Sequence, residues 1–466
     1  MKKIYEGSYC RGCFEKQIRI DRLEEENASL KRKLKYQERI KQEGYFGSST
    51  PSSKKPFKEN TKVEKEAKNG GGQKGHKGPG RTAILRTQAE DVEHHIVDET
   101  KCPKCHTPLI EKGSDERTIL DIEKKKAKKT LHICHKKYCP KCKKNIKKKP
   151  LVLPKSYYGN NLLAQAAVMH YVYGITLGKI VKMFDNEIGI GSLIESFHRL
   201  ARLFKTSIPK IIKEYRREPV KGADETGWRN DGKNGYCWLF RSKYISIFQF
   251  RESRAGVIAL EILGKIKLVG ILVIDRFKGY NRILCKIQYC YAHLLREVKD
   301  LGKEFPNVEE VQLFVKIFGK LLAEAMQLHS SGLSNKKYYK KARKIKREIQ
   351  KVINAPSQHL GIQHIQNIFR KNENRLYQWV KDRRVPADNN ATEREIRSTV
   401  IARKVSFGSQ SKKGAETRSI MMTILHTAMK RLKDKTIEEW FKEALDEIAL
   451  NPQKNPYSLL PPPRPP

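Results

Sequence analysis

The chain has 466 residues, of which 38% are hydrophobic, and it carries a formal net charge of +45 at pH 7. This length allows roughly two to four domains and at least one sizeable core. The charge makes nucleic acid the first partner to consider, ahead of an anionic membrane surface. The absence of any run of about 18 apolar residues excludes a transmembrane helix, and the polar N-terminus lacks the apolar region of a signal peptide. We expect a cytoplasmic protein whose ten cysteines are metal ligands or buried thiols rather than disulfides.

Residues 14–43 predict a short coiled coil. Alternating a and d positions of a heptad are occupied by Ile20, Leu23, Asn27, Leu30 and Leu34. A single Asn at an a position commonly fixes a parallel, two-stranded register, so the segment predicts self-association, at least as a dimer. Because only about three heptads are present, a solvated charged helix is the alternative.

Residues 44–90 predict a flexible basic linker, rich in Ser, Gly, Pro and Lys up to residue 82. Such a composition cannot bury enough apolar surface to fold alone. Its basic side chains could lie along a phosphate backbone, or the segment could be a solvated tether. The side chains in question are Lys74, His76, Lys77 and Arg81.

Residues 91–150 contain two C-P-K-C units and predict a zinc ribbon. The four cysteines are Cys102, Cys105, Cys139 and Cys142. Each unit places two thiolates at the spacing of a tight turn, and two units complete a closed tetrahedral Zn²⁺ site, which is structural because no ligand position stays open. Thirteen lysines and no acid lie between Lys124 and Lys149, which suits a module that grips phosphates. Reduced surface thiols are the alternative, and a third unit, Cys10 with Cys13, has no obvious partner pair.

Residues 151–215 predict a helical region that connects domains or binds DNA. Two apolar stripes at helical spacing indicate core-facing surfaces. The first stripe is Leu162, Leu163, Ala166, Met169, His170 and Tyr173, and the second is Leu193, Phe197, Leu200, Phe204 and Ile208. We expect His170 to be a core histidine with satisfied hydrogen bonds rather than a ligand.

From residue 216 the pattern becomes that of strands. One strand is expected to end at Asp224, and the runs 236–240 and 245–250 predict a hairpin. After a helix around 254–265, the apolar run 270–275 is typical of a central strand buried on both faces.

The rest of the chain predicts mostly helices. Residues 308–352 are expected to be helical with one apolar face, and residues 389–400 are expected to start another helix, capped by Asn389 or Asn390. That apolar face comprises Leu313, Phe314, Ile317, Phe318, Leu321 and Leu322. The chain closes with a C-terminal helical region over 416–450 and a Pro-rich tail over 451–466, of which Pro461–Pro466 is expected to be disordered or extended.

Asp224 and Asp275 both end apolar strands. Ligands of an open α/β sheet bind at that edge, and acids from adjacent strands stay ionised only with a cation between them. Glu393 shares a helix face with Ile396 and Val400, which are expected to point inward, and it would complete an oxygen cage suited to Mg²⁺. Two ions about 4 Å apart would activate an attacking oxygen and stabilise the leaving one at a phosphate.

Most of the 51 acids are expected to be solvent-exposed partners of the 96 Lys and Arg residues. Glu225 and Glu395 are the nearest competitors of the three acids, and we expect both to face solvent. Composition and periodicity alone leave the three carboxylates as one hypothesis among several.

Several further motifs follow one another along almost the whole chain. They are G-Q-K-G-H-K-G (Gly72–Gly78), A-D-E-T-G-W (Ala223–Trp228), V-I-D-R-F-K-G-Y (Val273–Tyr280), C-Y-A-H-L-L-R (Cys290–Arg296), D-N-N-A-T-E-R-E-I-R (Asp388–Arg397) and R-K-V-S-F-G-S (Arg403–Ser409). Together with the zipper-like start and the two C-x-x-C units, this order resembles the insertion-sequence 66 family of transposases, of the Asp-Asp-Glu type. One departure is Arg276, where the family usually has a small residue.

The resemblance implies a multidomain α/β protein with a ribonuclease-H-like mixed-sheet core over 216–415 and a helical insertion over 297–385. It implies that Asp224, Asp275 and Glu393 are the catalytic carboxylates that bind Mg²⁺ or Mn²⁺. His293 and Arg296, three residues apart on one helix face, could contact the scissile phosphate or be structural. By the family's pattern, the residues lining the DNA channel are Arg394, Arg397, Arg403 and Lys404.

The implied function is a prokaryotic, nucleoid-associated DNA transposase that cuts the ends of an insertion sequence and joins them to target DNA. Its partners would be the terminal repeats, the target DNA, further copies of the chain and accessory transposition proteins. Two alternatives stay open: a non-catalytic dimeric zinc-ribbon DNA-binding protein, and a ribonuclease-H-like nuclease that hydrolyses without joining.

Overall fold

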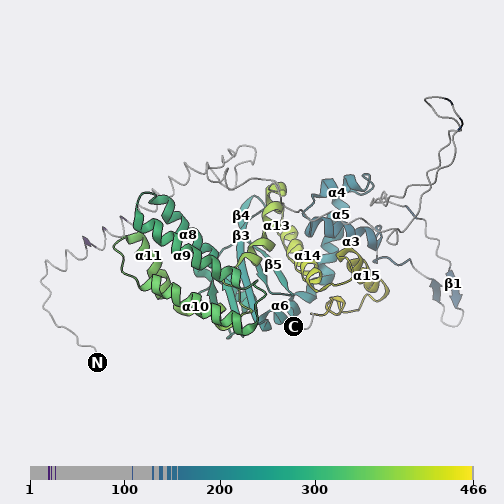
Figure 1. The fold of residues 1–466 in the computed structure, drawn as a ribbon. Helices are drawn as coiled ribbons and strands as arrows, with labels where there is room; N and C mark the ends of the chain where they lie inside the picture. The colour runs from purple at the N-terminus through teal and green to yellow at the C-terminus, as the bar shows by residue number, and fades with distance from the viewer. Residues whose placement is uncertain are drawn as a thin grey trace. The chain divides into compact units, whose positions relative to one another are not determined.

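The computed structural model describes residues 150–154 and 156–463, preceded by a few isolated residues and two short strands (Figure 1). The chain divides into two units, Met1–Lys125 and Lys126–Pro466. Of the predicted coiled coil, only four residues are described, and all four are helical: Arg19, Ile20, Leu23 and Asn27. The rest of the coiled coil and the linker lie outside the described residues, so both stay predictions.

Strands β1 (Lys136–Cys139) and β2 (Lys144–Lys147) form an antiparallel hairpin in which Cys139 pairs with Lys144. The second C-x-x-C unit therefore begins where β1 ends. The other three predicted zinc ligands lie outside the described residues, and the zinc ribbon stays a prediction.

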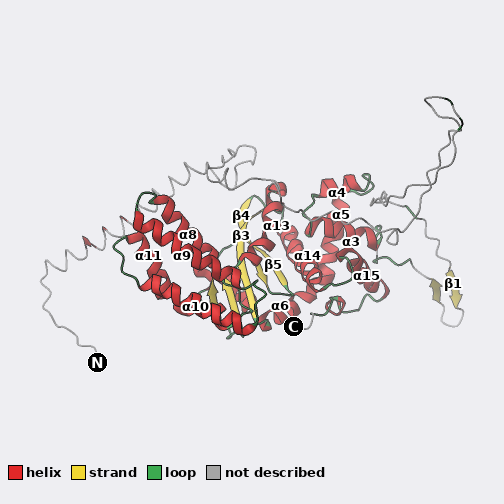
Figure 2. Ribbon diagram, in the orientation of Figure 1, coloured by secondary structure: helices red, strands yellow, loops and turns green. Residues whose placement is uncertain are grey.

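A five-stranded mixed sheet in the order β5-β4-β3-β6-β7 forms the centre of the second unit (Figure 2). Its strands are β3 (Val220–Asn230), β4 (Lys233–Arg241), β5 (Ser246–Arg251), β6 (Ile271–Ile274) and β7 (Lys286–Tyr289). The predicted hairpin is confirmed, since β4 and β5 pair antiparallel from Tyr236 with Arg251 to Arg241 with Ser246. The strand predicted at 270–275 is β6, an inner strand that pairs in parallel with both β3 and β7 and is buried throughout.

The strand predicted to end at Asp224 is longer than expected, because β3 continues to Asn230. The reason is the Asp231–Gly232 turn, in which both residues have positive φ, 52° and 71°. Such a two-residue turn matches the twist of a hairpin and pairs β3 with β4 along its whole second half.

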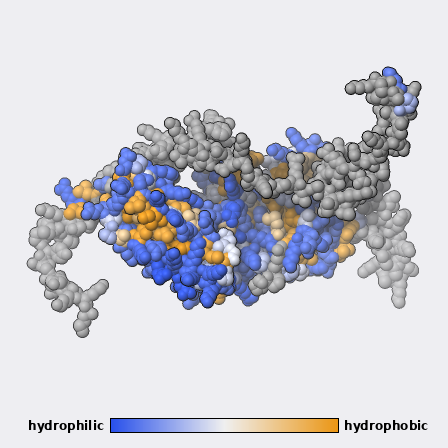
Figure 3. All heavy atoms as spheres, viewed as in Figure 1, coloured by the Kyte–Doolittle hydropathy of each residue, from blue (hydrophilic) through white to orange (hydrophobic). Residues whose placement is uncertain are grey.

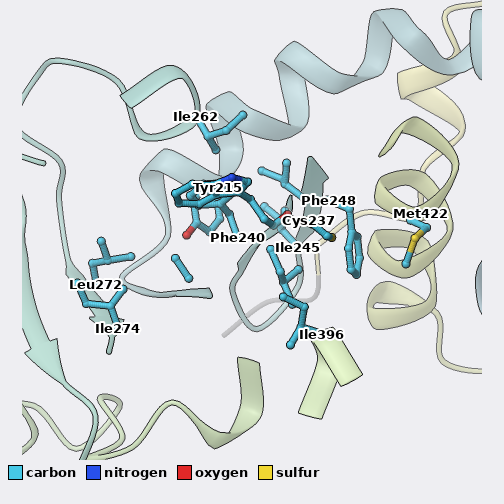
Figure 4. Packing of buried hydrophobic residues seen from close by; sticks show 14 of the residues in the cluster. Tyr215, Cys237, Phe240, Ile245, Phe248, Ile262, Leu272, Ile274, Ile396 and Met422 are labelled. Atoms are coloured by element: carbon cyan, nitrogen blue, oxygen red, sulfur yellow. Dashed lines mark hydrogen bonds between the residues drawn. The ribbon is translucent and has the colours of Figure 1, made fainter. Parts of the chain in front are cut away.

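Helices before and after the sheet pack into one hydrophobic core with it (Figure 4). They are α3 (Asn160–Tyr171), α4 (Leu177–Met183), α5 (Ile190–Phe204), α6 (Ile208–Arg217), α7 (Val257–Leu263), α14 (Lys412–Arg431) and α15 (Ile437–Leu450). Short 3₁₀ turns occupy Lys205–Ser207, Lys278–Tyr280, Glu373–Arg375 and Pro456–Leu459.

The stripe predicted on α5 lies in the core, with Leu193, Phe197, Leu200 and Phe204 buried. On the first predicted stripe, Leu163 and Ala166 are buried, but Tyr173 is 58% exposed because α3 ends at Tyr171.

His170 is a satisfied core histidine, as predicted. Its Nδ1 lies 2.9 Å from the carbonyl oxygen of Ile175, and its Nε2 accepts a hydrogen bond from Arg418. Burial, followed by the positive charge of Arg418, lowers the pKa of His170 to about 3.

The edge strand β5 is covered by α14, which places a ladder of hydroxyl groups along it. Ser419, Thr423 and Thr427, spaced four residues apart, accept hydrogen bonds from the backbone N–H groups of Phe250, Phe248 and Ser246. Exposed strand edges with unpaired N–H groups invite aggregation, and here the helix satisfies the edge instead. Figure 4 shows Phe248 of β5 beside Met422 of α14.

Five helices occupy the chain between β7 and α13 (Asn390–Ser406). They are α8 (Tyr291–Glu304), α9 (Glu309–Leu328), α10 (Asn335–Asn354), α11 (Leu360–Lys371) and α12 (Gln378–Lys381). The region predicted to be helical over 308–352 contains α9 and α10, and its predicted apolar face is only partly correct. Phe314, Phe318 and Leu322 are buried, whereas Leu313 and Ile317 are 56% and 44% exposed.

The correction at Leu313 and Ile317 has a geometric cause. The buried face of α9 follows Val311, Phe314 and Phe318, and residues one position before Phe314 or Phe318 point about 100° away from that line. Figure 3 shows hydrophobic side chains gathered on the surface over α8 and α9. No helix among the described residues is long and apolar enough to cross a membrane.

Candidate active site

Asp224 and Asp275 lie at the same edge of the sheet. The parallel pairing of β3 with β6 runs to Gly222 opposite Val273, and two more residues along each chain bring Asp224 level with Asp275. Backbone N–H groups orient both carboxylates: Asp224 Oδ1 accepts from Glu225 at 2.9 Å, and Asp275 Oδ1 accepts from Phe277 at 3.0 Å. The two aspartates therefore come together as the sequence predicted, although Asp224 lies within β3 rather than at its end.

Glu393 reaches this edge because α13 lies unusually close to β3. A Cβ atom at Gly222 would lie 2.3 Å from Thr392 Oγ1, so only glycine allows the helix to approach this closely. Asn389 Nδ2 donates to the carbonyl oxygen of Ala223, and Thr392 Oγ1 donates to Asn389 Oδ1, at 2.9 and 2.6 Å. Asn389 occupies the predicted cap position, but its side chain holds the helix to the strand instead of capping a helical N–H.

The predicted inward face of α13 is only partly formed. Ile396 is buried, whereas Val400 is half-buried and the fully buried residue of that turn is Thr399.

The electrostatics of Asp224 show that the three acids lie near one another. Burial, together with the negative charges of Glu225, Asp275 and Glu393, raises the pKa of Asp224 to about 7. Like charges held in a partly buried site disfavour ionisation unless a cation lies among them. The three carboxylates thus form a site that is electrostatically unfavourable by itself and chemically suited to a divalent cation.

Helix α8 supplies the other groups near Glu393. Its start is fixed by Cys290 N, which donates to the Ile274 carbonyl at 2.8 Å, and by Tyr291 N, which donates to Ala387 at 2.9 Å. Arg296 Nη2 donates to both Glu393 oxygens at 3.0 and 3.2 Å, and His293 Nδ1 lies 3.6 Å from Glu393 Oε1. The predicted pair on one helix face is present, and it faces Glu393.

Cys290, His293 and Glu393 each place one ligand atom within 4.8 Å of the others. Burial raises the pKa of the Cys290 thiol to about 11, and its sulfur accepts a hydrogen bond from Asn389 N at 3.1 Å. A thiol kept protonated in this way is a poor metal ligand, since metals bind the thiolate. Cys290 therefore serves to join α8 to the start of α13.

Four basic residues predicted to line a DNA channel all lie on α13. Arg394, Arg397 and Lys404 are exposed. Arg403 is half-buried and lies over β3, since a Cβ at Gly227 would be 3.3 Å from its Nη1. Arg276, the departure noted in the sequence, forms an ion pair with Glu297 of α8.

Glu225 and Glu395 do not face solvent, and this expectation was wrong. The Glu225 side chain is 1% exposed and accepts hydrogen bonds from Arg254 and from the Tyr280 hydroxyl. It alternates with Asp224 along β3 and so lies on the other face of the sheet.

The Glu395 side chain is 12% exposed and forms ion pairs with Arg241 and Lys430. Two helical residues turn a side chain by about 200°, which directs Glu395 toward β4 and α14 and away from Glu393. No local sequence pattern predicts the partners of Glu225 or of Glu395, because those partners come from distant segments of the chain.

Two comparisons with known proteins bear on the family of the chain. A family model described as "Transposase IS66 family" matches residues 155–417, a little more than half of the chain. The chain is also 36% identical, over 83 residues, to the "Uncharacterized protein y4hP" of Sinorhizobium fredii (strain NBRC 101917 / NGR234), a match that spans 18% of this chain and 15% of that protein. The matched segment 155–417 contains the sheet, α13 and all three carboxylates, and the chain belongs to the IS66 family of transposases.

Proposed function

We propose that the protein is a DNA transposase that cuts the ends of an insertion sequence and joins them to target DNA by metal-dependent phosphoryl transfer. The observation that carries this proposal is the convergence of Asp224, Asp275 and Glu393 from β3, the end of β6 and α13, with the pKa of Asp224 raised to about 7. Family membership supports it. The strand order β5-β4-β3-β6-β7, with one antiparallel and one parallel half, supports a ribonuclease-H-like core.

The residues fit Mg²⁺ or Mn²⁺. Both ions prefer carboxylate oxygens, and a cation would relieve the repulsion that Asp275, Glu393 and Glu225 impose on Asp224. Asp224, Asp275 and Glu393 would hold the metal, and Glu225 would stay with Arg254 on the other face of the sheet. Two ions bound there would activate an attacking oxygen and stabilise the leaving one.

The chain's own residues would position the DNA. Arg296 is 57% exposed and lies against Glu393, so it is placed to bind a phosphate brought to the carboxylates. Arg394, Arg397 and Lys404, exposed on α13, would hold further phosphates and carry little base specificity.

Water would attack the phosphodiester at the element's end and break its P–O3′ bond, which frees a 3′-hydroxyl on the element and leaves a 5′-phosphate on the flanking strand. That 3′-hydroxyl would then attack a target phosphodiester in line, forming a new P–O bond while the target's own 3′-oxygen leaves as a hydroxyl. Both steps are phosphoryl transfers in which position and charge lower the barrier.

The distinguishing experiment uses the purified full chain and a labelled DNA fragment carrying the terminal repeats that flank its gene. We expect end cleavage and joined products with Mg²⁺ and neither product with EDTA. Cleavage without joined products would favour a nuclease. Binding without cleavage at any Mg²⁺ or Mn²⁺ concentration would favour the non-catalytic DNA-binding protein.

The N-terminal segments carry a separate proposal that rests on the sequence. We infer that Cys102, Cys105, Cys139 and Cys142 bind one structural Zn²⁺ and that residues 14–43 join two copies. Metal analysis should find about one zinc per chain, which Cys102→Ser with Cys105→Ser should remove. Size measurement by light scattering should find at least a dimer, which deletion of residues 14–43 should dissociate.

A further inference from the structure

Phe407 combines an unusual backbone conformation with an exposed aromatic ring. It ends α13 with φ 59°, in the left-handed region, and its side chain is 61% exposed. The other non-glycine residues with positive φ in the described part of the chain are Asp, Asn and His, types that tolerate this region. A bulky aromatic residue there is strained, and its ring is not buried in compensation. Strain retained at an exposed position suggests a function.

The turn around Phe407 is held by α13 on one side and by the end of β3 on the other. Phe407 N donates to Arg403 O at 2.8 Å, Ser409 N donates to Arg229 O at 2.9 Å, and Asp231 N donates to Ser409 O at 2.8 Å. Gly408 has φ 128°, and a Cβ there would lie 2.2 Å from Arg229 O. The backbone is therefore fixed without any help from the phenyl ring, which is presented to the surface.

A basic stripe leads from the carboxylates to this ring. Arg394, Arg397, Ile401 and Lys404 are exposed at helical spacing, and Phe407 follows Lys404 by three residues. No acid occurs from Arg397 to Ser409. The stripe is thus complementary to a phosphate backbone, with apolar groups interspersed.

Unpartnered polar atoms gather at the same turn. Among the described residues, five buried side-chain polar atoms have no hydrogen-bond partner, and three of them belong to Arg229, Asn230 and Arg403. Arg403 begins the turn that Phe407 completes, and Arg229 and Asn230 pair with Ser409. Buried polar groups are rarely left unpaired, so this turn is polar and incompletely satisfied directly beside the exposed ring.

We propose that Phe407 stacks on a base that leaves the DNA helix close to the cleaved end. The proposal rests on the proposed function, because it takes DNA as the occupant of this surface. Phe407 follows Glu393 by fourteen residue steps, or about 21 Å at 1.5 Å per step along a helix. At 3.4 Å per base pair, DNA lying along α13 with its cleaved phosphate at Glu393 would meet Phe407 about six base pairs away. Apolar side chains that enter a base step unstack and kink the duplex.

The test uses the full chain and a series of terminal-repeat duplexes. In each duplex, 2-aminopurine replaces one base, at a position about four to eight base pairs from the cleaved phosphate. This adenine analogue becomes more fluorescent when it leaves the base stack. Wild type is expected to raise the fluorescence at one or two adjacent positions in that range. Phe407→Asn removes the ring but suits the left-handed backbone, so it should fold normally, lose the fluorescence rise and bind the duplex about ten- to a hundredfold more weakly. Phe407→Trp should keep the rise, and Val405→Ala, a neighbouring exposed apolar residue, should stay within about twofold of wild type.

The outcomes separate this inference from the proposed function. A fluorescence rise that depends on Phe407, in a protein that never cleaves DNA, would support the stacking role and contradict the transposase proposal. Cleavage by wild type together with an unchanged fluorescence rise and affinity in Phe407→Asn would overturn the stacking role alone. An altered oligomeric state of Phe407→Asn without DNA, with unchanged fluorescence, would also overturn it and would assign the ring to a protein contact.

Discussion

The two sides of the sheet differ in how fully their charged and polar groups are paired. On the β5 side, the edge N–H groups are bonded by the hydroxyls of α14, and Glu395 is neutralised by Arg241 and Lys430. At the carboxylate edge, which we define as Asp224, Asp275 and Glu393, the charges of Asp275 and Glu393 help to raise the pKa of Asp224, and among the described residues Arg296 and His293 lie close to Glu393. Two glutamates only two residues apart on α13 thus differ: Glu395 belongs to a largely buried ion-pair network, whereas Glu393 lies near other acids and its ion-pair partner Arg296 is 57% exposed. Under the proposed function, the carboxylate edge would be retained for chemistry at the expense of stability.

The largest expected effect is the loss of activity at the carboxylate edge. Asp224→Asn and Glu393→Gln keep the side-chain shape but remove the charge that would bind the metal. Metal-bound charge stabilisation is worth several kcal/mol, so cleavage of an end fragment should fall roughly a thousandfold or more, while DNA affinity is retained. Glu443→Gln, an exposed acid on α15 paired with Lys435, is the matched control and should cleave normally. Unchanged cleavage by Glu393→Gln would remove Glu393 from the site.

The next effect is on stability and falls on the β5 side. Glu395→Ala leaves Arg241 and Lys430 without their partner in a largely buried place. Breaking a buried ion pair in this way costs about 3–5 kcal/mol, which urea unfolding would measure. Glu443→Ala should change stability by less than about 0.5 kcal/mol. A loss below about 1 kcal/mol for Glu395→Ala would mean that the two sides of the sheet are less different than their contacts indicate.

Replacing Asp224 should raise the free energy of unfolding, whereas replacing Glu395 lowers it. Its pKa is raised from 3.8 to about 7 on folding, so between these values the folded state binds more protons and stability falls as pH rises. The cost is absent below about pH 4 and complete above about pH 7. In EDTA, Asp224→Asn should therefore be more stable than wild type at pH 8, by up to about 4 kcal/mol. This difference in stability should shrink as the pH falls and vanish near pH 4. Thermal and urea unfolding across this pH range check the prediction, and a variant less stable than wild type at pH 8 would contradict it.

The smallest effect concerns the hydroxyl ladder. Thr423→Val keeps the shape of the side chain but leaves the N–H of Phe248 without its acceptor. An unsatisfied buried donor costs about 1–3 kcal/mol, so urea unfolding should show a loss in that range with normal end cleavage. Thr423→Ser keeps the hydroxyl and should therefore lose little stability compared with Thr423→Val. Thr206→Val, at an exposed position, is the control and should change stability little. No difference between the Val and Ser variants would show that the ladder does not stabilise the edge.

The sequence predicted the elements that periodicity and turn chemistry define. Alternation and apolar runs placed the β4–β5 hairpin and β6, and the strand-end position of Asp275 followed directly. The extension of β3 beyond Asp224 was missed, although the Asp231–Gly232 pair carries the local signal for the turn that causes it.

Contacts between distant segments were not predictable from local patterns. Glu393 reaches the site through the close approach of Gly222 to Thr392, and Glu395 is buried because Arg241 and Lys430 come from β4 and α14. Helix periodicity gives the direction of each side chain but not the charge it meets. For this reason the choice between Glu393 and Glu395 rested on the family resemblance, and the burial of Glu225 was not foreseen.

The central claim is that the carboxylate edge is a divalent-metal site, and Mg²⁺ titration followed by thermal unfolding at pH 8 tests it most directly. We predict that Mg²⁺ raises the unfolding temperature of wild type and of Thr423→Val, and leaves those of Asp224→Asn and Glu393→Gln nearly unchanged. Equal shifts in wild type and Asp224→Asn, or no shift in wild type at any Mg²⁺ or Mn²⁺ concentration, would contradict the claim.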